Sequence, residues 1–116
     1  MENYKFRVEF LDEAKEFLDG LDEKARQKII YNIWKSRNTN NPKLFKKLQD
    51  EIWEFRTKYN KFYYRLFAFW DKTNKDDTVV ISTNGLIKKT DKTPKSEIEK
   101  AERLREKYFN DKNNKK

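Results

Sequence analysis

The stretch that most constrains the fold is residues 51–70, EIWEFRTKYNKFYYRLFAFW, in which aromatic side chains recur throughout. Their alternation predicts two β-strands, and KYNK at 58–61 predicts the hairpin turn between them, although it lacks the Asn-Gly pair of the tightest turns. In the second strand, 62–70, both sets of alternating positions are apolar except at Arg65, which predicts a central strand buried on both faces. A sheet that needs only a core has no use for guanidinium groups, yet Arg56 and Arg65 lie within these strands with no acid between them.

Because successive side chains of a strand point to opposite faces, the alternation also predicts which residues share a face. In the first strand we expect Trp53 and Phe55 on one face, and Ile52, Glu54 and Arg56 on the other. In the second strand we expect one face to carry Phe62, Tyr64, Leu66, Ala68 and Trp70, and the other to carry Tyr63, Arg65, Phe67 and Phe69.

The N-terminal third of the chain predicts one strand and two helices. Residues 4–10, YKFRVEF, alternate between apolar and charged side chains, as a half-buried strand does. Apolar residues at helical spacing then predict a short helix that Asp12 caps and Gly20 punctuates, and a second helix from Asp22 to about Arg37. Together the two helices predict a helical hairpin lying on a sheet.

The segments around the aromatic hairpin are more basic. Residues 44–50, LFKKLQD, are short and lead into the first aromatic strand. Residues 78–84, TVVISTN, are the most β-branched segment and predict another strand, which Gly85 ends or bends. We interpret residues 86–93, LIKKTDKT, as a basic segment that leaves this strand.

A final helix follows, and two N-terminal signals compete for its start. Thr93 and Pro94 suit the N-cap and first helical positions, whereas Ser96 and Glu99 offer a capping box. The last residues, 110–116 (NDKNNKK), predict a flexible basic tail. The element order is therefore β-α-α-β-β-β-α, which predicts a single α+β domain over residues 1–109 with an antiparallel-rich, four-stranded sheet.

Composition narrows the functions that are open to the chain. Its net charge of +8 over 116 residues favours an anionic partner, although a lysine-rich surface without a partner gives the same balance. The absence of cysteine and histidine removes disulfides, thiolate chemistry, the usual general base and the commonest transition-metal ligand. The first ten residues, MENYKFRVEF, have no apolar core of a signal peptide, and no apolar run approaches a membrane span, so we expect a cytoplasmic protein without a membrane partner.

Three groups of basic residues surround the aromatic strands. They are Lys43, Lys46 and Lys47; then Arg56, Lys58, Lys61 and Arg65; and lastly Lys88, Lys89 and Lys92. Depending on the strand register, Arg56 and Arg65 meet on one face at cross-strand distance. Two arginines on a stiff sheet suit a phosphate, because their planar forks bind its oxygens bidentately and keep their charge.

Aromatic residues between the cations suggest which polyanion is bound. Tyr59, Tyr63 and Tyr64 lie where they can stack on unpaired bases, which favours single-stranded RNA over duplex DNA. The alternatives are structural: Arg65 is a core arginine paired with an acid such as Glu54, the tyrosines belong to the core, and Lys88, Lys89 and Lys92 form a solvated loop. Spacing alone therefore predicts a small basic α+β domain that binds a polyanion.

The motifs IWEFR (52–56), YYRLFAFW (63–70) and NGLIKKTDKTPKSEIEKA (84–101) resemble the RelE/ParE superfamily of bacterial toxins, and most closely its HigB-type, phage-derived branch. The resemblance runs from FLDGLDEKARQKI at 17–29 through the last helix, and it implies the RelE-like fold. It also implies a toxin of a type II toxin-antitoxin system that enters the ribosomal A site and cuts the bound mRNA. The implied reaction is attack by the 2′-hydroxyl on the adjacent phosphate, with neither metal nor cofactor.

The resemblance carries roles onto particular residues. Arg65 matches the central-strand arginine that holds the scissile phosphate, and Arg56 matches a basic residue on the preceding strand. Lys88 and Lys89 fall where the family places basic catalytic residues. The expected RNA-binding residues are Lys43, Lys46, Lys47, Lys58, Tyr59, Lys61, Tyr63 and Lys92.

The chain departs from the family at two points. Glu54 stands where some relatives carry lysine, and the histidines of other HigB proteins are absent. The general base is therefore Glu54 or a lysine whose pKa its cationic neighbours lower, and we favour Glu54 as an orienting partner of Arg56. No tyrosine opens the last helix, so Tyr59 or Tyr63 would have to supply the stacking surface.

Two other functions fit the same scaffold. One is a ParE-like toxin that inhibits gyrase, and the other is a non-catalytic module that binds nucleic acid or a partner protein. If the protein is a toxin, whether an mRNA endonuclease or a gyrase inhibitor, we expect a cognate antitoxin. This would be a helix-turn-helix DNA-binding protein that covers the basic surface or blocks entry into the ribosome.

Overall fold

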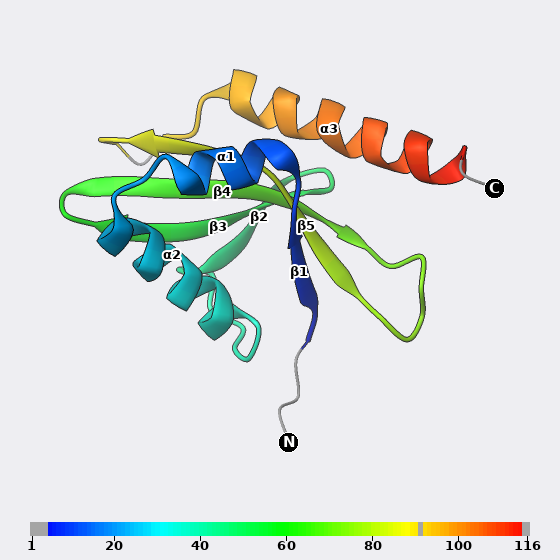
Figure 1. Cartoon of the computed structure of the whole chain (residues 1–116), viewed down its shortest axis with the longest axis horizontal. Helices are drawn as coiled ribbons and strands as arrows, with labels where there is room; N and C mark the ends of the chain where they lie inside the picture. The colour runs from blue at the N-terminus through cyan, green and yellow to red at the C-terminus, as the bar shows by residue number, and fades with distance from the viewer. Residues whose placement is uncertain (1–4, 91, 115–116) are drawn as a thin grey trace.

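The computed structural model describes residues 5–90 and 92–114, and over these residues the chain forms three helices and five strands (Figure 1). Their order and bounds are β1 (Arg7–Phe10), α1 (Asp12–Asp19), α2 (Glu23–Ser36), β2 (Phe45–Gln49), β3 (Ile52–Tyr59), β4 (Phe62–Asp71), β5 (Val79–Lys88) and α3 (Lys95–Asn113). The expected α+β class is confirmed. Residue 4 of the first expected strand and residues 115–116 of the expected tail lie outside the described residues.

The described strands form one mixed sheet in the order β1-β5-β4-β3-β2. β1 runs parallel to β5, and the other neighbours are antiparallel. The prediction of four strands was wrong, because Phe45–Gln49 pairs with β3 as an edge strand instead of leading into it. Lysine side chains are common on edge strands, and here Lys46 and Lys47 interrupt the apolar alternation that would have revealed β2.

The hairpin between β3 and β4 confirms the turn predicted at 58–61. Tyr59 faces Phe62 across the strands, and the two residues between them, Asn60 and Lys61, have φ of 51° and 72°. Positive φ at both central positions is what a type I′ turn requires, and it matches the twist of the strands. The turn thus forms without the glycine that usually occupies its second position.

β5 continues three residues beyond Gly85, so the segment expected to leave the strand is partly inside the sheet. A register irregularity lies between Leu66 and Ala68 of β4, where β5 passes from Ser82 to Gly85. Gly85 does not have a positive φ. A Cβ at this position would instead come within 2.3 Å of the Phe17 ring, so the glycine serves a close approach of α1 to the sheet.

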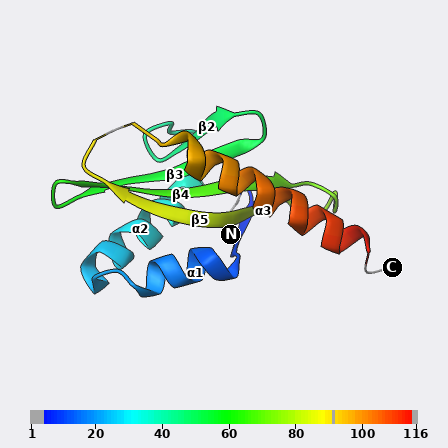
Figure 2. The same ribbon diagram turned by 90° about the horizontal axis from the view of Figure 1, so that it is seen from above.

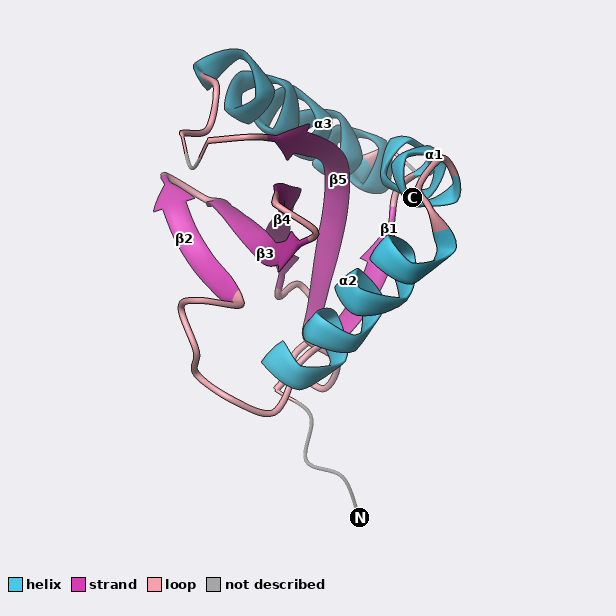
Figure 3. Cartoon of the chain, turned by 90° about the vertical axis from the view of Figure 1, so that its left-hand side faces the viewer, coloured by secondary structure: helices cyan, strands magenta, loops and turns pink. Residues whose placement is uncertain are grey.

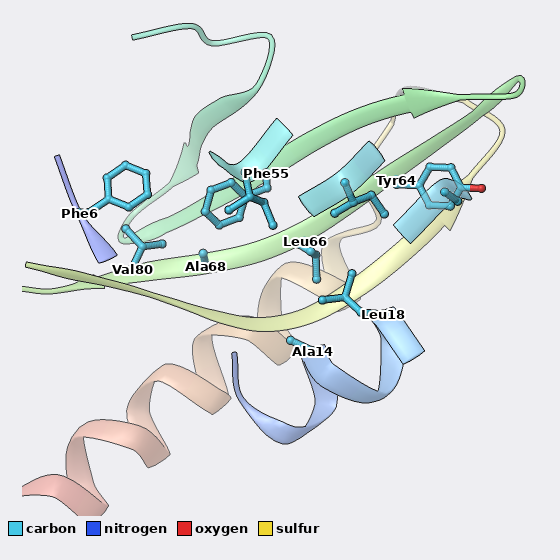
Figure 4. Close-up of a cluster of buried hydrophobic side chains, with 11 residues drawn as sticks. Phe6, Ala14, Leu18, Phe55, Tyr64, Leu66, Ala68 and Val80 are labelled. Carbon is cyan, nitrogen blue, oxygen red and sulfur yellow. The ribbon is translucent and has the colours of Figure 1, made fainter. Parts of the chain in front are cut away.

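Helices cover both faces of the sheet (Figure 2). The first core cluster packs α1 and α2 against one face and includes Leu18, Ile29 and Leu66. Figure 4 shows Leu18 and Leu66 in this cluster. The second cluster packs Ile98 and Ala101 of α3 against the other face. The division of β3 and β4 between these clusters confirms the predicted faces, and β4 is the central strand.

The helix ends agree with the sequence in part. Asp22 caps α2, because its carboxylate accepts the N–H of Ala25 at 3.3 Å. Asp12 is the first residue of α1 and not its cap, which is Leu11. α3 begins after Pro94 without a side-chain cap, so both the Thr93 cap and the Ser96–Glu99 capping box are wrong.

The C-terminal end of α3 is fastened to the end of β4. Asp71, which is buried, accepts hydrogen bonds from the Tyr108 hydroxyl at 2.6 Å and the Lys112 ammonium at 2.7 Å. α3 extends through Asn113, so residues 110–113 of the expected tail are helical. None of the described helices has both the length and the apolar character that crossing a membrane requires.

Candidate functional site

The candidate site lies on the α3 face of the sheet, beyond the part that α3 covers. Under α3 this face is apolar, with Ile52 of β3 and Phe67 and Phe69 of β4 in the second core cluster. Two residues further toward the β3–β4 hairpin, the same face of the two strands carries Glu54, Arg56 and Arg65. Apolar residues thus give way to charged ones beyond the N-terminal end of α3.

Arg56 and Arg65 are directly opposite each other in the β3–β4 register, as the phosphate interpretation required. Like charges in such a pair repel each other, and one carboxylate offsets the repulsion. Glu54 places Oε2 3.4 Å from Arg56 Nε and Oε1 3.4 Å from Arg65 Nε. The side chains of Arg65 and Glu54 are 3% and 4% exposed, whereas that of Arg56 is 21% exposed.

Glu54 is the electrostatic centre of the site. Burial raises the pKa of its carboxyl group, and the charges of Arg65, Arg56, Lys88 and Lys46 oppose that rise. These four cations come from β4, β3, β5 and β2 respectively, so four neighbouring strands direct positive charge at one carboxylate. Burial outweighs the cations, and the pKa of Glu54 stays above its ordinary value.

A small pocket opens beside the two arginines. It has a volume of about 140 Å³ and is lined by Lys43, Arg56, Thr57, Lys58, Tyr63 and Arg65, without a carboxylate. Ligand pockets for drug-sized molecules usually hold about 300–1,000 Å³, so this one suits a single phosphate group better than a whole nucleotide. We call it the arginine pocket.

The ring of Tyr63, which lines the arginine pocket, makes cation–π contacts with two basic side chains. Lys58 Nζ and Arg65 Cζ each lie 5.4 Å from the centre of the Tyr63 ring. Arg56 donates from Nη1 to the Pro42 carbonyl at 3.3 Å, which ties the loop before β2 to β3. The pocket is therefore held by contacts among its own cations, ring and backbone.

The structure gathers some of the predicted residues and separates others. The charge of Glu54 interacts with those of four predicted residues, which are Arg56, Arg65, Lys46 and Lys88. The arginine pocket is lined by three more, which are Lys43, Lys58 and Tyr63. The remaining residues lie elsewhere: Lys47 and Tyr59 on the opposite face of the sheet, Lys61 in the hairpin turn, and Lys89 and Lys92 exposed between β5 and α3. Tyr64, which the sequence offered for stacking, is a core residue.

Sequence reasoning missed two residues at the site, namely Thr57, which lines the arginine pocket, and Thr93 beside it. Thr93 was expected to cap α3, but its hydroxyl accepts a hydrogen bond from the Lys88 ammonium at 2.7 Å. No local signal distinguishes this role from a cap, because an N-cap residue is also extended and also often precedes a proline. The alternative in which Arg65 pairs with Glu54 also matches the observed geometry.

Larger hollows occur away from the arginines. One of about 590 Å³ lies between α1 and α3 and contains none of the predicted site residues. Its lining of Leu11, Leu104 and Tyr108 with flanking charges brings together no group that suggests a reaction. The arginine pocket, although smaller, is where the predicted chemistry converges.

Comparisons with known proteins place the chain in a family. The sequence profile of the phage-derived protein Gp49-like family (DUF891) matches residues 16–106, which is most of the chain. A comparison with curated proteins gave no significant match. The chain therefore belongs to the Gp49-like family, whose members are RelE-like, toxin-type proteins.

Proposed function

We propose that this Gp49-like protein is the toxin of a type II toxin-antitoxin system, of the HigB-like branch, and that it cuts mRNA on the ribosome. Membership of the family is compatible with a toxin. The observation that carries the proposal further is the Arg56–Arg65 pair, which lies directly across two strands and borders a pocket of phosphate size. A cationic site of this kind stabilises negative charge that develops on a phosphate.

The proposed reaction needs no metal. The 2′-oxygen attacks the adjacent phosphorus, the bond from phosphorus to the 5′-oxygen breaks, and the products are a 2′,3′-cyclic phosphate and a 5′-hydroxyl. The 2′-hydroxyl loses a proton and the departing 5′-oxygen gains one, so the step is balanced when one group accepts a proton and another donates one.

Roles follow from where the residues lie. Arg56 and Arg65 bind the phosphate oxygens and stabilise the pentavalent phosphorane. Glu54 orients both guanidiniums and does not contact the RNA, since its side chain is almost fully buried and each of its oxygens faces one arginine. We assign one of the two proton transfers to Lys88, which shares the arginine face of the sheet. Lys89 is exposed beyond β5, away from the arginines, and receives no role here.

The burial of Arg65 favours a second candidate function. Its guanidinium is largely enclosed and paired with Glu54, as in a structural ion pair. In that case the pocket binds an anion through Arg56 and the lysines but catalyses nothing, and the protein is a non-catalytic binding module. A ParE-like gyrase inhibitor differs from both in that its target is DNA gyrase.

Induced expression in bacteria followed by mapping of mRNA 5′ ends tests the proposal. We expect growth arrest and new 5′ ends within translated reading frames, both lost in Arg65→Ala and strongly reduced in Arg56→Gln. Losing one such donor costs about 10²–10³ in rate. Arg103→Ala on the exposed side of α3 is the matched control and should remain toxic.

Each alternative predicts a different result. Full toxicity of a folded Arg65→Ala protein, verified by thermal melting, would remove the catalytic assignment. Stabilised DNA cleavage complexes without new mRNA ends indicate the gyrase inhibitor. No growth arrest on clean induction indicates the non-catalytic module.

We also propose that a cognate antitoxin neutralises the protein, either by covering the arginine pocket or by preventing entry into the ribosome. A short neighbouring reading frame that encodes a helix-turn-helix protein would support this, and co-expression of that protein should restore growth.

A further inference from the structure

A second pocket lies at the β2 edge of the sheet, and the proposed reaction does not use it. It has a volume of about 300 Å³ and is enclosed by the residues before β1, the end of α2, the loop from α2 to β2, and strands β2, β3 and β4. In Figure 3 that loop swings out past the edge of the sheet before it reaches β2. We call it the edge pocket. It is lined by Lys5, Phe6, Ser36, Thr39, Asn40, Asn41, Pro42, Phe45, Lys46, Lys47, Trp53 and Trp70.

The aromatic part of the edge pocket is a contiguous set of rings. The ring centres of Phe45 and Trp53 are stacked 4.9 Å apart, those of Trp53 and Trp70 meet edge to face at 5.7 Å, and those of Phe6 and Trp70 at 5.1 Å. Phe45, Trp53 and Trp70 are each only partly buried. Partly exposed aromatic rings at a pocket wall are the surfaces on which nucleobases stack.

The charged side chains among the lining residues of the edge pocket are all positive. The lining includes Lys5, Lys47 and the amide residues Asn40 and Asn41, with no carboxylate; the third lysine of the lining, Lys46, directs its side chain to the arginine side of β2. Lys5 donates to the Asn40 side chain, which holds one of these lysines at the rim. Amides bond to the edges of bases and lysines bind phosphates, so the pocket offers the two kinds of polar contact that a nucleotide needs.

The edge strand connects this pocket with the arginine pocket. Lys46 is opposite Glu54 and so faces the arginine side, whereas Lys47 is opposite Trp53 and faces the edge pocket. β2 is the outermost strand of the described sheet, so no further strand separates the two faces at this edge. A chain of phosphates that passes Lys46 meets Lys47 once it has crossed β2.

We propose that the edge pocket binds one nucleotide of single-stranded RNA, with its base against the aromatic rings and its phosphate on Lys47. The strand then continues around β2 past Lys46 toward the arginine pocket. This inference rests on the proposed function for the identity of the ligand as RNA. Binding of an acidic protein segment is the competing occupant, but carboxylates would use the lysines and would not stack on the partly exposed aromatic rings.

The chain supplies its own reporter for this site. It has three tryptophans, and two of them, Trp53 and Trp70, line the edge pocket, while the third, Trp34, is exposed on α2. A Trp34→Phe variant, excited at a wavelength that tyrosine does not absorb, therefore fluoresces only from the edge pocket. The probe is a short single-stranded oligoribonucleotide carrying 2′-O-methyl at every position, which binds but cannot be cut by 2′-oxygen attack.

We expect this oligonucleotide to change the fluorescence of the Trp34→Phe protein in a saturable way. Lys47→Gln should weaken binding by about three- to fivefold. It should also lower the slope of log Kd against log salt by about 0.7, the contribution of one phosphate contact in a single strand. Lys35→Gln, on the exposed surface of α2, is the matched control and should change neither quantity. Among small probes, 5′-AMP should change the fluorescence more than ribose 5-phosphate at the same concentration.

The outcomes separate the inference from the proposed function. A protein that cuts mRNA but shows no fluorescence change with the oligonucleotide overturns the edge pocket alone. A saturable, Lys47-dependent change in a protein that cuts nothing supports the edge pocket and removes the nuclease. An equal response to a polyglutamate peptide, or to ribose 5-phosphate, overturns base recognition in the pocket.

Discussion

The glycine at position 85, within the motif NGLIKKTDKTPKSEIEKA (84–101), supports a prediction whose magnitude follows from one contact. A Cβ added there would lie 2.3, 2.4 and 2.6 Å from Cδ2, Cγ and Cε2 of Phe17. Carbon atoms pack at about 3.5–4.0 Å, so the ring must move by more than an ångström. Overpacking of this kind costs about 1–3 kcal/mol. The loss of glycine flexibility in the unfolded chain returns about 0.4–1 kcal/mol, because Gly85 has no positive φ that alanine would strain.

Gly85→Ala should therefore lower the free energy of unfolding by about 1–2 kcal/mol, measured by urea titration with tryptophan fluorescence. The control is the same substitution in a Phe17→Ala background, where the ring is absent and the change should be neutral or slightly stabilising. An equal loss in both backgrounds would refute the reasoning, because the cost would then arise from the backbone and not from the approach of α1. Confirmation would mean that this motif glycine is kept for packing and not for chemistry.

Three further predictions concern charge and backbone. Burial would raise the pKa of Asp71, but the hydrogen bonds from Lys112 and Tyr108 hold it well below its usual range. The contribution of Asp71 to stability is therefore present above the ordinary carboxyl pKa and lost as pH falls. Asp71→Asn should reduce the loss of unfolding free energy at acid pH, measured by urea titration. Lys61→Gly should raise the free energy of unfolding by about 0.5–1 kcal/mol, because φ of 72° strains a side chain that glycine lacks. Burial raises the pKa of Glu54, so its contribution to stability is present below the ordinary carboxyl pKa and lost as pH rises. Glu54→Gln should be as stable as the parent at neutral pH by thermal melting, and a large loss of stability would show that its ion pairs outweigh desolvation. The variant should still bind phosphate but fail to arrest growth, because the amide no longer orients both guanidiniums.

The parts of the fold that could be predicted are those in which large apolar side chains carry the period. β3 and β4 alternate so regularly that strand bounds, turn and faces all followed. β2 was missed because an edge strand in this chain is built from lysine, whose charge hides the alternation. The end of β5 was placed too early because Gly85 was interpreted as a break, whereas its contact is with a helix far away in the sequence.

The sequence predicted some of the charged residues that the structure brings together, but not how deeply they are buried. The arginines stood out because no acid lies between them, but only the register shows that Arg56 faces Arg65. The sharing of Glu54 by both arginines and the burial of Arg65 depend on how neighbouring strands and loops pack around them, which no local pattern encodes. Thr93 was misassigned because its hydroxyl had two possible partners, the helix N-terminus and Lys88, and only the folded chain brings the second within reach.

The enclosed Arg65–Glu54 pair need not oppose phosphate binding, because the charges at the site do not balance. Arg65 from β4, Arg56 from β3, Lys88 from β5 and Lys46 from β2 all act on the single carboxylate of Glu54, which leaves the field positive even when that carboxylate is ionised. A phosphate entering the arginine pocket would compete with Glu54 for the same guanidiniums and would raise its pKa further. By linkage, protonation of Glu54 must then tighten phosphate binding by the same factor. The buried acid is thus a counter-charge that the substrate can replace, which is how a site can remain folded while empty and still stabilise an extra negative charge when RNA is bound.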